Sequence, residues 1–112
     1  FRATHGEDGS SDSLGYLTSA DQAQGTSYQL LAGSIGNDND QGVSGYLHIF
    51  NPADTTFVKQ FIGTFNSIAH SNRCNTQHVA GYFNTTSALT QFSFKFSAGT
   101  VDSGDIILYG VN

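Results

Sequence analysis

The sequence predicts an all-β fold, an antiparallel β-sandwich with jelly-roll-like topology and about eight short strands. Apolar and polar residues alternate with a period of two in several segments, which is the pattern of strands with one buried face. Aromatic residues make up 12% of the 112 residues, and they favour strands. Thirteen glycines, with many Ser, Thr, Asn and Asp residues, supply turns about every ten residues.

No long helix is predicted. Apolar residues at helical spacing do not continue beyond one turn, and the best helical candidate, residues 19–24, is short and polar. A chain of this length without a repeat, linker or low-complexity tract predicts a single β-sandwich domain over residues 1–112. Because the chain begins with Phe1 and not with Met, we expect a processed part or a fragment of a longer chain.

Turn residues bound each expected strand. The acidic, Gly/Ser-rich residues 6–13 and the NDNDQG sequence at residues 37–42 are expected to be loops, and Asn51-Pro52 ends a strand. Residues 66–77 are polar and fit either a loop or a weak strand. In chain order, the expected strands cover residues 14–17, 26–35, 43–50, 55–65, 78–84, 88–96 and 106–111.

The end of the chain carries the strongest pattern. Residues 92–96 alternate Phe with Ser or Lys, so they predict a strand with one apolar face. Residues 106–111 are apolar on both faces, which predicts a strand paired into a sheet and covered on two sides. The expected core residues are Phe92, Phe94, Phe96, Leu47, Ile49, Ile106 and Leu108. The second face of the last strand, expected to contact another subunit, consists of Ile107, Tyr109 and Val111.

Charge is scarce in this chain. Charged residues make up 12% of the sequence, roughly half the usual share, and the net charge is −5. The four basic residues, which are Arg2, Lys59, Arg73 and Lys95, form no cluster in the sequence that could follow a phosphate backbone or an anionic membrane. We therefore expect no nucleic-acid and no membrane partner. A surface with few charges favours packing against copies of the same chain, because little charge has to be desolvated.

Two segments resemble metal sites in composition, but neither provides a complete set of ligands. A calcium loop needs an acidic ligand six residues after its glycine, and His48 stands six residues after Gly42. His70, Cys74 and His78 are four residues apart, which would align zinc ligands on a helix, but their surroundings are poor in helix formers. On a strand, neighbours in this series would be about 13 Å apart. No metal or other cofactor is predicted.

Catalysis is not indicated by the sequence. It contains no G-x-S-x-G turn, and Glu7 is its single glutamate, next to Asp8 in an expected loop. We therefore expect that the protein is not an enzyme. Two modest signals for carbohydrate are present. Asn84-Thr85-Thr86 is an N-glycosylation sequon, and exposed tyrosines could stack on sugars, although core packing is the commoner fate of such residues.

The closing sequence GTVDSGDIILYGVN, with the preceding ALTQFSFKF, resembles the C-terminal domain of many structural proteins of tailed bacteriophages. In that family a strand of the type itxfxfxf is followed by a Ser/Gly-rich turn and a closing sGxixLYGi strand. Phe1-Arg2 followed by GEDGSSDS is similar to the family's R-x-s-x-d-G-g opening, and VSGYLHIFNP is similar to its sGxixixnP strand. The resemblance implies a jelly-roll-like domain of virion decorations, fibres or tails, often oligomeric, and it implies no catalytic residues.

Taken together, these observations predict a structural subunit on a virion surface or in another extracellular setting. Its expected partners are copies of itself, in an oligomer or a fibrous assembly, and other virion proteins or a surface glycan are further candidates. One alternative is a subunit of a microbial fibril or pilus-like filament, which would use the same packing. Another is a carbohydrate-binding module at the tip of a phage fibre.

Overall fold

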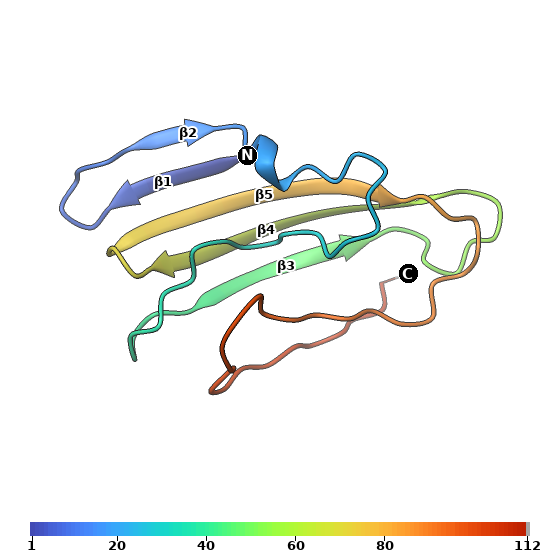
Figure 1. Ribbon diagram of the computed structural model, residues 1–112. Coiled ribbons are helices and arrows are strands. Elements are labelled where there is room, and N and C mark those ends of the chain that lie inside the picture. Colours follow the sequence, from blue (N-terminus) through green and yellow to red (C-terminus); the bar gives the residue numbers. More distant parts are fainter. Residues whose placement is uncertain (112) are drawn as a thin grey trace.

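The computed structural model describes residues 1–111 and contains one antiparallel sheet of five strands in the order β2-β1-β5-β4-β3 (Figure 1). In the described residues, helical structure is limited to one 3-10 turn, Thr18–Ala20. The all-β prediction is confirmed by this arrangement. The strands are β1 (Arg2–Gly6), β2 (Ser13–Gly15), β3 (Val43–Ile49), β4 (Lys59–Ala69) and β5 (Arg73–Phe83).

The long hairpin of β4 and β5 forms the centre of the sheet. Eleven residues of β4 pair with eleven of β5, from Lys59↔Phe83 to Ala69↔Arg73. The three-residue turn between them is closed by the Asn72 N–H, which donates to the Ala69 carbonyl at 2.9 Å. Asn72 has a φ of 53°, a left-handed conformation that Asn tolerates better than most residues, so the sequence is suited to this turn.

Residues alternate between an inner and an outer face of the sheet. On the inner face, phenylalanine rings lie opposite glycines of neighbouring strands, because Phe61 pairs with Gly81 and Phe65 pairs with Gly45. A Cβ atom on Gly81 would lie 2.8 Å from Cζ of Phe61. Because these glycines have no Cβ atom, they leave the space that the phenylalanine rings occupy. Phe61 also contacts Phe83, with ring centroids 5.2 Å apart.

The most deeply buried side chains of the inner face are polar. Lys59 Nζ donates to the Thr85 carbonyl at 3.2 Å, and Ser67 Oγ donates to the Gly33 carbonyl at 3.3 Å. Gln77 Oε1 accepts the Gly33 N–H. Ala69 is the one buried hydrophobic residue among residues 1–111. Hydrogen bonds to crossing segments therefore contribute much of what holds the second layer to the sheet.

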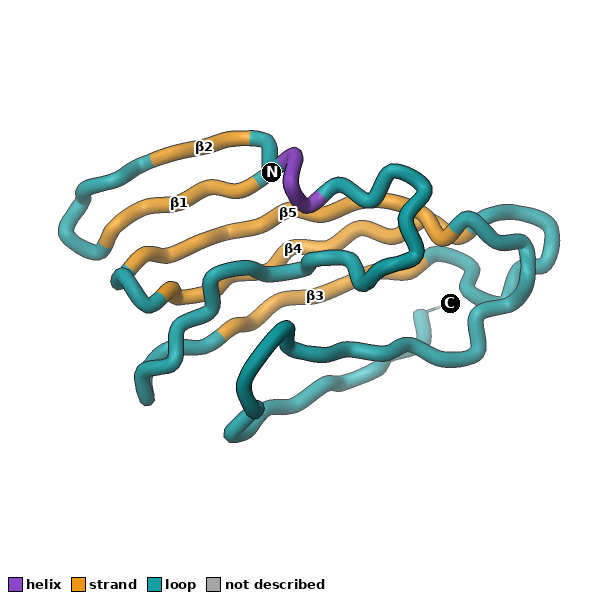
Figure 2. Tube along the Cα trace, viewed as in Figure 1, coloured by secondary structure: helices purple, strands orange, loops and turns teal. Residues whose placement is uncertain are grey.

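Two irregular segments form this second layer. Residues 26–36 reach the inner face through Gly33, and residues 84–96 reach it through Phe92, whose ring centroid is 6.2 Å from that of Phe83. The two segments contact each other, since Tyr28 Oη and Ser93 Oγ are 2.9 Å apart and Lys95 Nζ lies 4.3 Å from the Tyr28 ring centroid. Figure 2 shows both segments as loop. A second sheet, as a sandwich requires, is not assigned within residues 1–111.

Several strand predictions are confirmed. The strand predicted over residues 43–50 is β3, which ends at Ile49; residues 78–84 overlap the end of β5, and residues 14–17 overlap the short β2. The strand expected over residues 55–65 begins at Lys59 and extends to Ala69. Residues 6–13 and 37–42 lie outside strands except at Gly6 and Ser13, which end β1 and begin β2. β1 itself was not predicted.

The polar residues 66–77 contain the end of β4, the turn and the start of β5, so a loop was the wrong alternative. Polar side chains lie on both faces here. Ser67 and Gln77 are buried on the inner face, while Asn66 and Thr76 pair on the outer face, where Asn66 Nδ2 donates to Thr76 Oγ1 at 3.0 Å. Side-chain hydrogen bonds replace the apolar alternation that would have signalled a strand.

The strands predicted over residues 26–35, 88–96 and 106–111 are not formed within this chain, and this corrects the expected pairing of its end into the sheet. The expected core is also partly wrong. Leu47 and Ile49 are half-buried, whereas the exposed fractions are 38% to 49% for Phe92, Phe94 and Phe96 and still larger for Ile106 and Leu108. Alternating apolar and polar residues indicate that one face of a segment favours burial. The surface that buries this face is a matter of tertiary structure, and it need not belong to the same chain.

We expect Gly45→Ala to destabilise the sheet by about 1–3 kcal/mol, because overpacking of this kind forces backbone and ring to shift. The added Cβ would lie 2.5 Å from both the Thr64 carbonyl oxygen and Phe65 Cδ1. Urea denaturation measures the change. Gly15→Ala in β2 is the matched control, since a Cβ there meets no atom within 4 Å. Equal stabilities of the two variants would contradict this account of the inner face.

Asp54 stabilises the turn before β4, and this contribution depends on pH. Its Oδ1 accepts the N–H groups of Phe57 and Thr56 at 2.7 Å and 2.6 Å, and these bonds, with a smaller effect of Lys59, lower the pKa of Asp54 below 3.8. The folded state thus favours the carboxylate. Its contribution is complete above pH 3.8 and is lost as the pH falls through the lower pKa of the folded protein.

Asp54→Asn keeps an oxygen acceptor but does not titrate. We expect its free energy of unfolding to fall less than that of the wild type between about pH 5 and pH 2, as measured by denaturation at a series of pH values. Thr55→Ser, an exposed and non-titrating position next to Asp54, should follow the wild-type curve. A wild-type curve for Asp54→Asn would show that the turn bonds do not contribute.

Candidate functional site

The C-terminal segment, residues 105–111, exposes apolar side chains on both of its faces. After β5 the chain runs out and back in two extended stretches that carry no strand (Figure 1). The exposed fractions lie between 67% and 87% for Ile106, Ile107, Leu108, Tyr109 and Val111. The residues expected to contact another subunit, Ile107, Tyr109 and Val111, are thus accessible, and so are their neighbours on the opposite side.

The main-chain groups of this segment, like its apolar side chains, are not engaged in pairing with the sheet. Within residues 90–111, no main-chain N–H or carbonyl is paired with another main-chain group. Such groups are hydrogen-bonded to water while the segment is exposed, and they must find partners when it is covered. The segment therefore combines apolar side chains with a backbone that is free to form a ladder.

The outer face of β3, β4 and β5 is a second accessible surface, and it carries no Asp, Glu, Lys or Arg. Tyr46 and Tyr82 are 57% and 59% exposed on it, and Ile62 lies between them on β4. The Tyr46 ring packs edge-on against His48, with centroids 5.3 Å apart. Depletion of charge with exposed aromatic residues is typical of the centre of an interface.

The residues considered as zinc ligands do not converge. His70 lies in the β4–β5 turn, while Cys74 and His78 lie on the outer face of β5. Their side chains bond to β4, since Asn66 Nδ2 donates to Cys74 Sγ at 3.2 Å and Thr64 Oγ1 is 3.0 Å from His78 Nδ1. No group of three metal-ligating side chains occurs in the described part of the chain.

Asn84, the residue of the sequon, directly follows β5 and is exposed. The neighbouring Thr85 supplies the carbonyl that accepts the Lys59 hydrogen bond, and its side-chain Oγ1 accepts the Ser87 N–H at 3.1 Å. The sequon therefore lies on an accessible turn, where an attached glycan would meet no buried surface.

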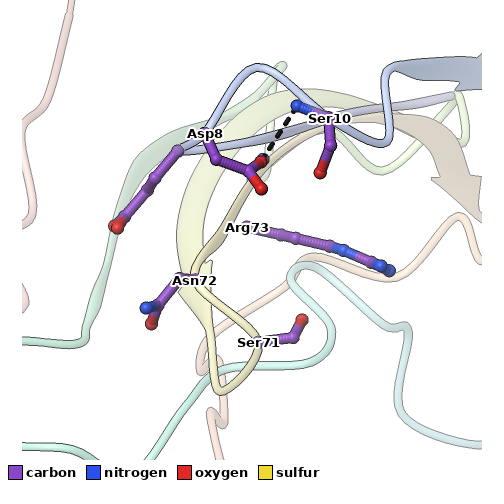
Figure 3. A pocket seen from close by; sticks show the side chains of 7 residues that line it. Asp8, Ser10, Ser71, Asn72 and Arg73 are labelled. Carbon is purple, nitrogen blue, oxygen red and sulfur yellow. Dashed lines mark hydrogen bonds between the residues drawn. The ribbon is translucent and has the colours of Figure 1, made fainter.

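The acidic loop between β1 and β2 forms a shallow hollow against the β4–β5 turn, with side chains that point in different directions (Figure 3). Asp8 Oδ1 accepts the Ser10 N–H at 2.9 Å. Bonding to Ser10, through its side chain and its backbone, lowers the pKa of the Asp8 carboxyl. Arg73 Nη2 lies 3.4 Å from Ser11 Oγ. These contacts order the loop, and they provide no nucleophile with an adjacent base.

Comparison with models of protein families, with curated proteins and with solved structures gives no match to this chain. Across residues 1–111, no helix has the length and apolar character needed to cross a membrane.

Sequence reasoning identified the C-terminal segment but missed the outer face. Tyr46 and His48 lie on the same strand, β3, but the other residues of this face come from β4 and β5. The signal that could have found this surface is the absence of charge at alternate positions of all three strands, once their register is known.

Proposed function

We propose that the protein is a structural subunit that assembles with copies of itself through its C-terminal segment. The observation that carries this proposal is the exposure of five apolar side chains on two faces of one extended, unpaired stretch. Exposed apolar surface of this kind marks an interaction site. Covering one such side chain contributes about 1.5–3 kcal/mol, so even partial cover of the segment favours association.

The subunit belongs, in this proposal, to a viral particle, as a capsid decoration, a fibre or a tail component. Support comes from the resemblance of the opening, the β3 sequence and the closing sequence to the structural proteins of tailed bacteriophages. Other virion proteins are further partners, and the location is the virion surface. A microbial fibril or pilus-like filament is the alternative that rests on the same packing. The role requires no catalysis, cofactor, nucleic acid or membrane.

The jelly-roll-like sandwich is part of the proposal. Residues 26–36 and 84–96 already lie over the inner face of the five-stranded sheet and contact each other through Tyr28, Ser93 and Lys95. These two segments lie where the second sheet of a sandwich would lie, but they are not joined by the main-chain hydrogen bonds of a sheet. In this proposal, assembly orders the two segments into strands. A neighbouring copy excludes the water molecules that hydrogen-bond to their main-chain groups, and these groups then pair with other main-chain groups.

Light scattering at micromolar concentration tests self-assembly. The wild type is expected to form oligomers or fibres, and Ile107→Lys with Tyr109→Lys to raise the dissociation constant at least about a hundredfold, because two apolar contacts become desolvated charges. Val101→Lys, an exposed position before the segment, is the matched control and should assemble like the wild type. A wild type that remains monomeric contradicts the proposed function.

A carbohydrate-binding module at a fibre tip is the second candidate function, and the exposed Tyr46 and Tyr82 on the uncharged outer face favour it. Aromatic rings on an accessible sheet face can stack on sugars, although no tryptophan is present. A glycan array is the test. Binding that is lost in Tyr46→Ala and in Tyr82→Ala, and kept in Tyr109→Ala, would support this role. An array without binding would contradict it.

A further inference from the structure

We propose that the C-terminal segment of one copy, residues 105–111, adds as a sixth strand to the free edge of β3 in a second copy. This inference rests on the proposed self-assembly and specifies its mechanism. β3 is the last strand of the order β2-β1-β5-β4-β3, so β4 is its one strand neighbour. An extended segment that joins such an edge gains main-chain hydrogen bonds along its whole length.

The hydrogen-bonding pattern shows which groups of β3 are free. The Phe50 N–H donates to the Gln60 carbonyl, and the Ile68 N–H donates to the Gly42 carbonyl. Residues of an antiparallel strand alternate between pairing with one neighbour and pointing away from it. Even-numbered residues of β3 thus face β4, and the backbone groups that point outward belong to Val43, Gly45, Leu47 and Ile49.

These outward groups have no main-chain partner within residues 1–111. β3 also lacks the features by which sheet edges avoid pairing. It contains no Pro, Lys, Arg, Asp or Glu, and its seven residues pair with seven consecutive residues of β4 without a bulge. The opposite edge differs, because β2 is three residues long. The sheet is therefore open to strand addition at β3 and closed to it at β2.

The C-terminal segment fits this edge in length and character. Residues 105–111 match the seven residues of β3 in number, and their backbone is unpaired in the described structure. The segment contains no Pro, and it alternates apolar side chains on both faces, so one face would extend the inner layer of the neighbour. Each copy then has one donor segment and one acceptor edge, so the contact is head-to-tail and produces rings or open filaments.

Complementation between two full-length variants tests the mechanism. Leu47→Pro removes a central outward N–H of the acceptor edge, and Ile107→Pro with Leu108→Pro removes the donor ladder. Leu47→Ala and Ile107→Ala with Leu108→Ala are the matched controls, since they lose similar side-chain contacts but keep every N–H. Circular dichroism verifies that each variant is folded. Should Leu47→Pro fail to fold, Val43→Pro replaces it, because Pro is tolerated at the first residue of an edge strand.

Each proline variant alone is expected to be monomeric by light scattering, and an equimolar mixture is expected to form heterodimers of twice the mass. Each alanine control should assemble by itself, more weakly than the wild type. A mixture that stays monomeric, or a donor-blocked variant that assembles like the wild type, overturns strand addition. If the wild type assembles while the mixture does not, this inference fails and the proposed function stands. A monomeric wild type overturns both.

Discussion

The fold depends on one steric constraint, which is the fit of phenylalanine rings over glycines in the β3–β4–β5 sheet. Phe61 lies opposite Gly81 and Phe65 opposite Gly45, so a register shift of one residue would place rings against side chains. Because the side-chain period of a strand is two, such a shift would also exchange the two faces. The fit therefore fixes both the register of the central strands and the identity of the inner face, on which the second layer rests.

The inner face is secured by polar contacts to an unusual degree. Lys59, Ser67 and Gln77 are buried and bond to the main chain of crossing segments. Such bonds specify position, but a neutral one contributes about 1 kcal/mol net, less than a buried large apolar side chain. The chain keeps much of its apolar surface outside, on the outer face and in the C-terminal segment. This distribution links the fold to the proposed assembly, because the surface that a single copy leaves uncovered is the surface that copies can share.

Prediction from sequence succeeded where apolar alternation has a local cause. β3 was placed within one residue of its end, and residues 59–65 of β4 lie in a predicted strand. It left residues 66–77 open between a loop and a weak strand, because Asn66 and Thr76 form a polar pair across two strands that no local pattern reveals. It failed at residues 106–111, whose apolarity was recognised while their pairing within the chain was wrongly expected. The outer face was missed because it is made by three strands in register.

Three properties follow from the sequence alone: the chain is β-rich, it is poor in charge, and residues 106–111 are apolar on both faces. These are properties of residue type and spacing, which act over a few neighbouring residues. The tertiary structure decided which backbone groups are paired and which remain free, since pairing depends on strands far apart in the chain. Among residues 1–111, it left the outward groups of β3 and of residues 105–111 without main-chain partners. The local sequence thus decides which side chains are apolar. Whether they become buried depends on contacts with distant segments of the chain and, in our proposal, with second copies.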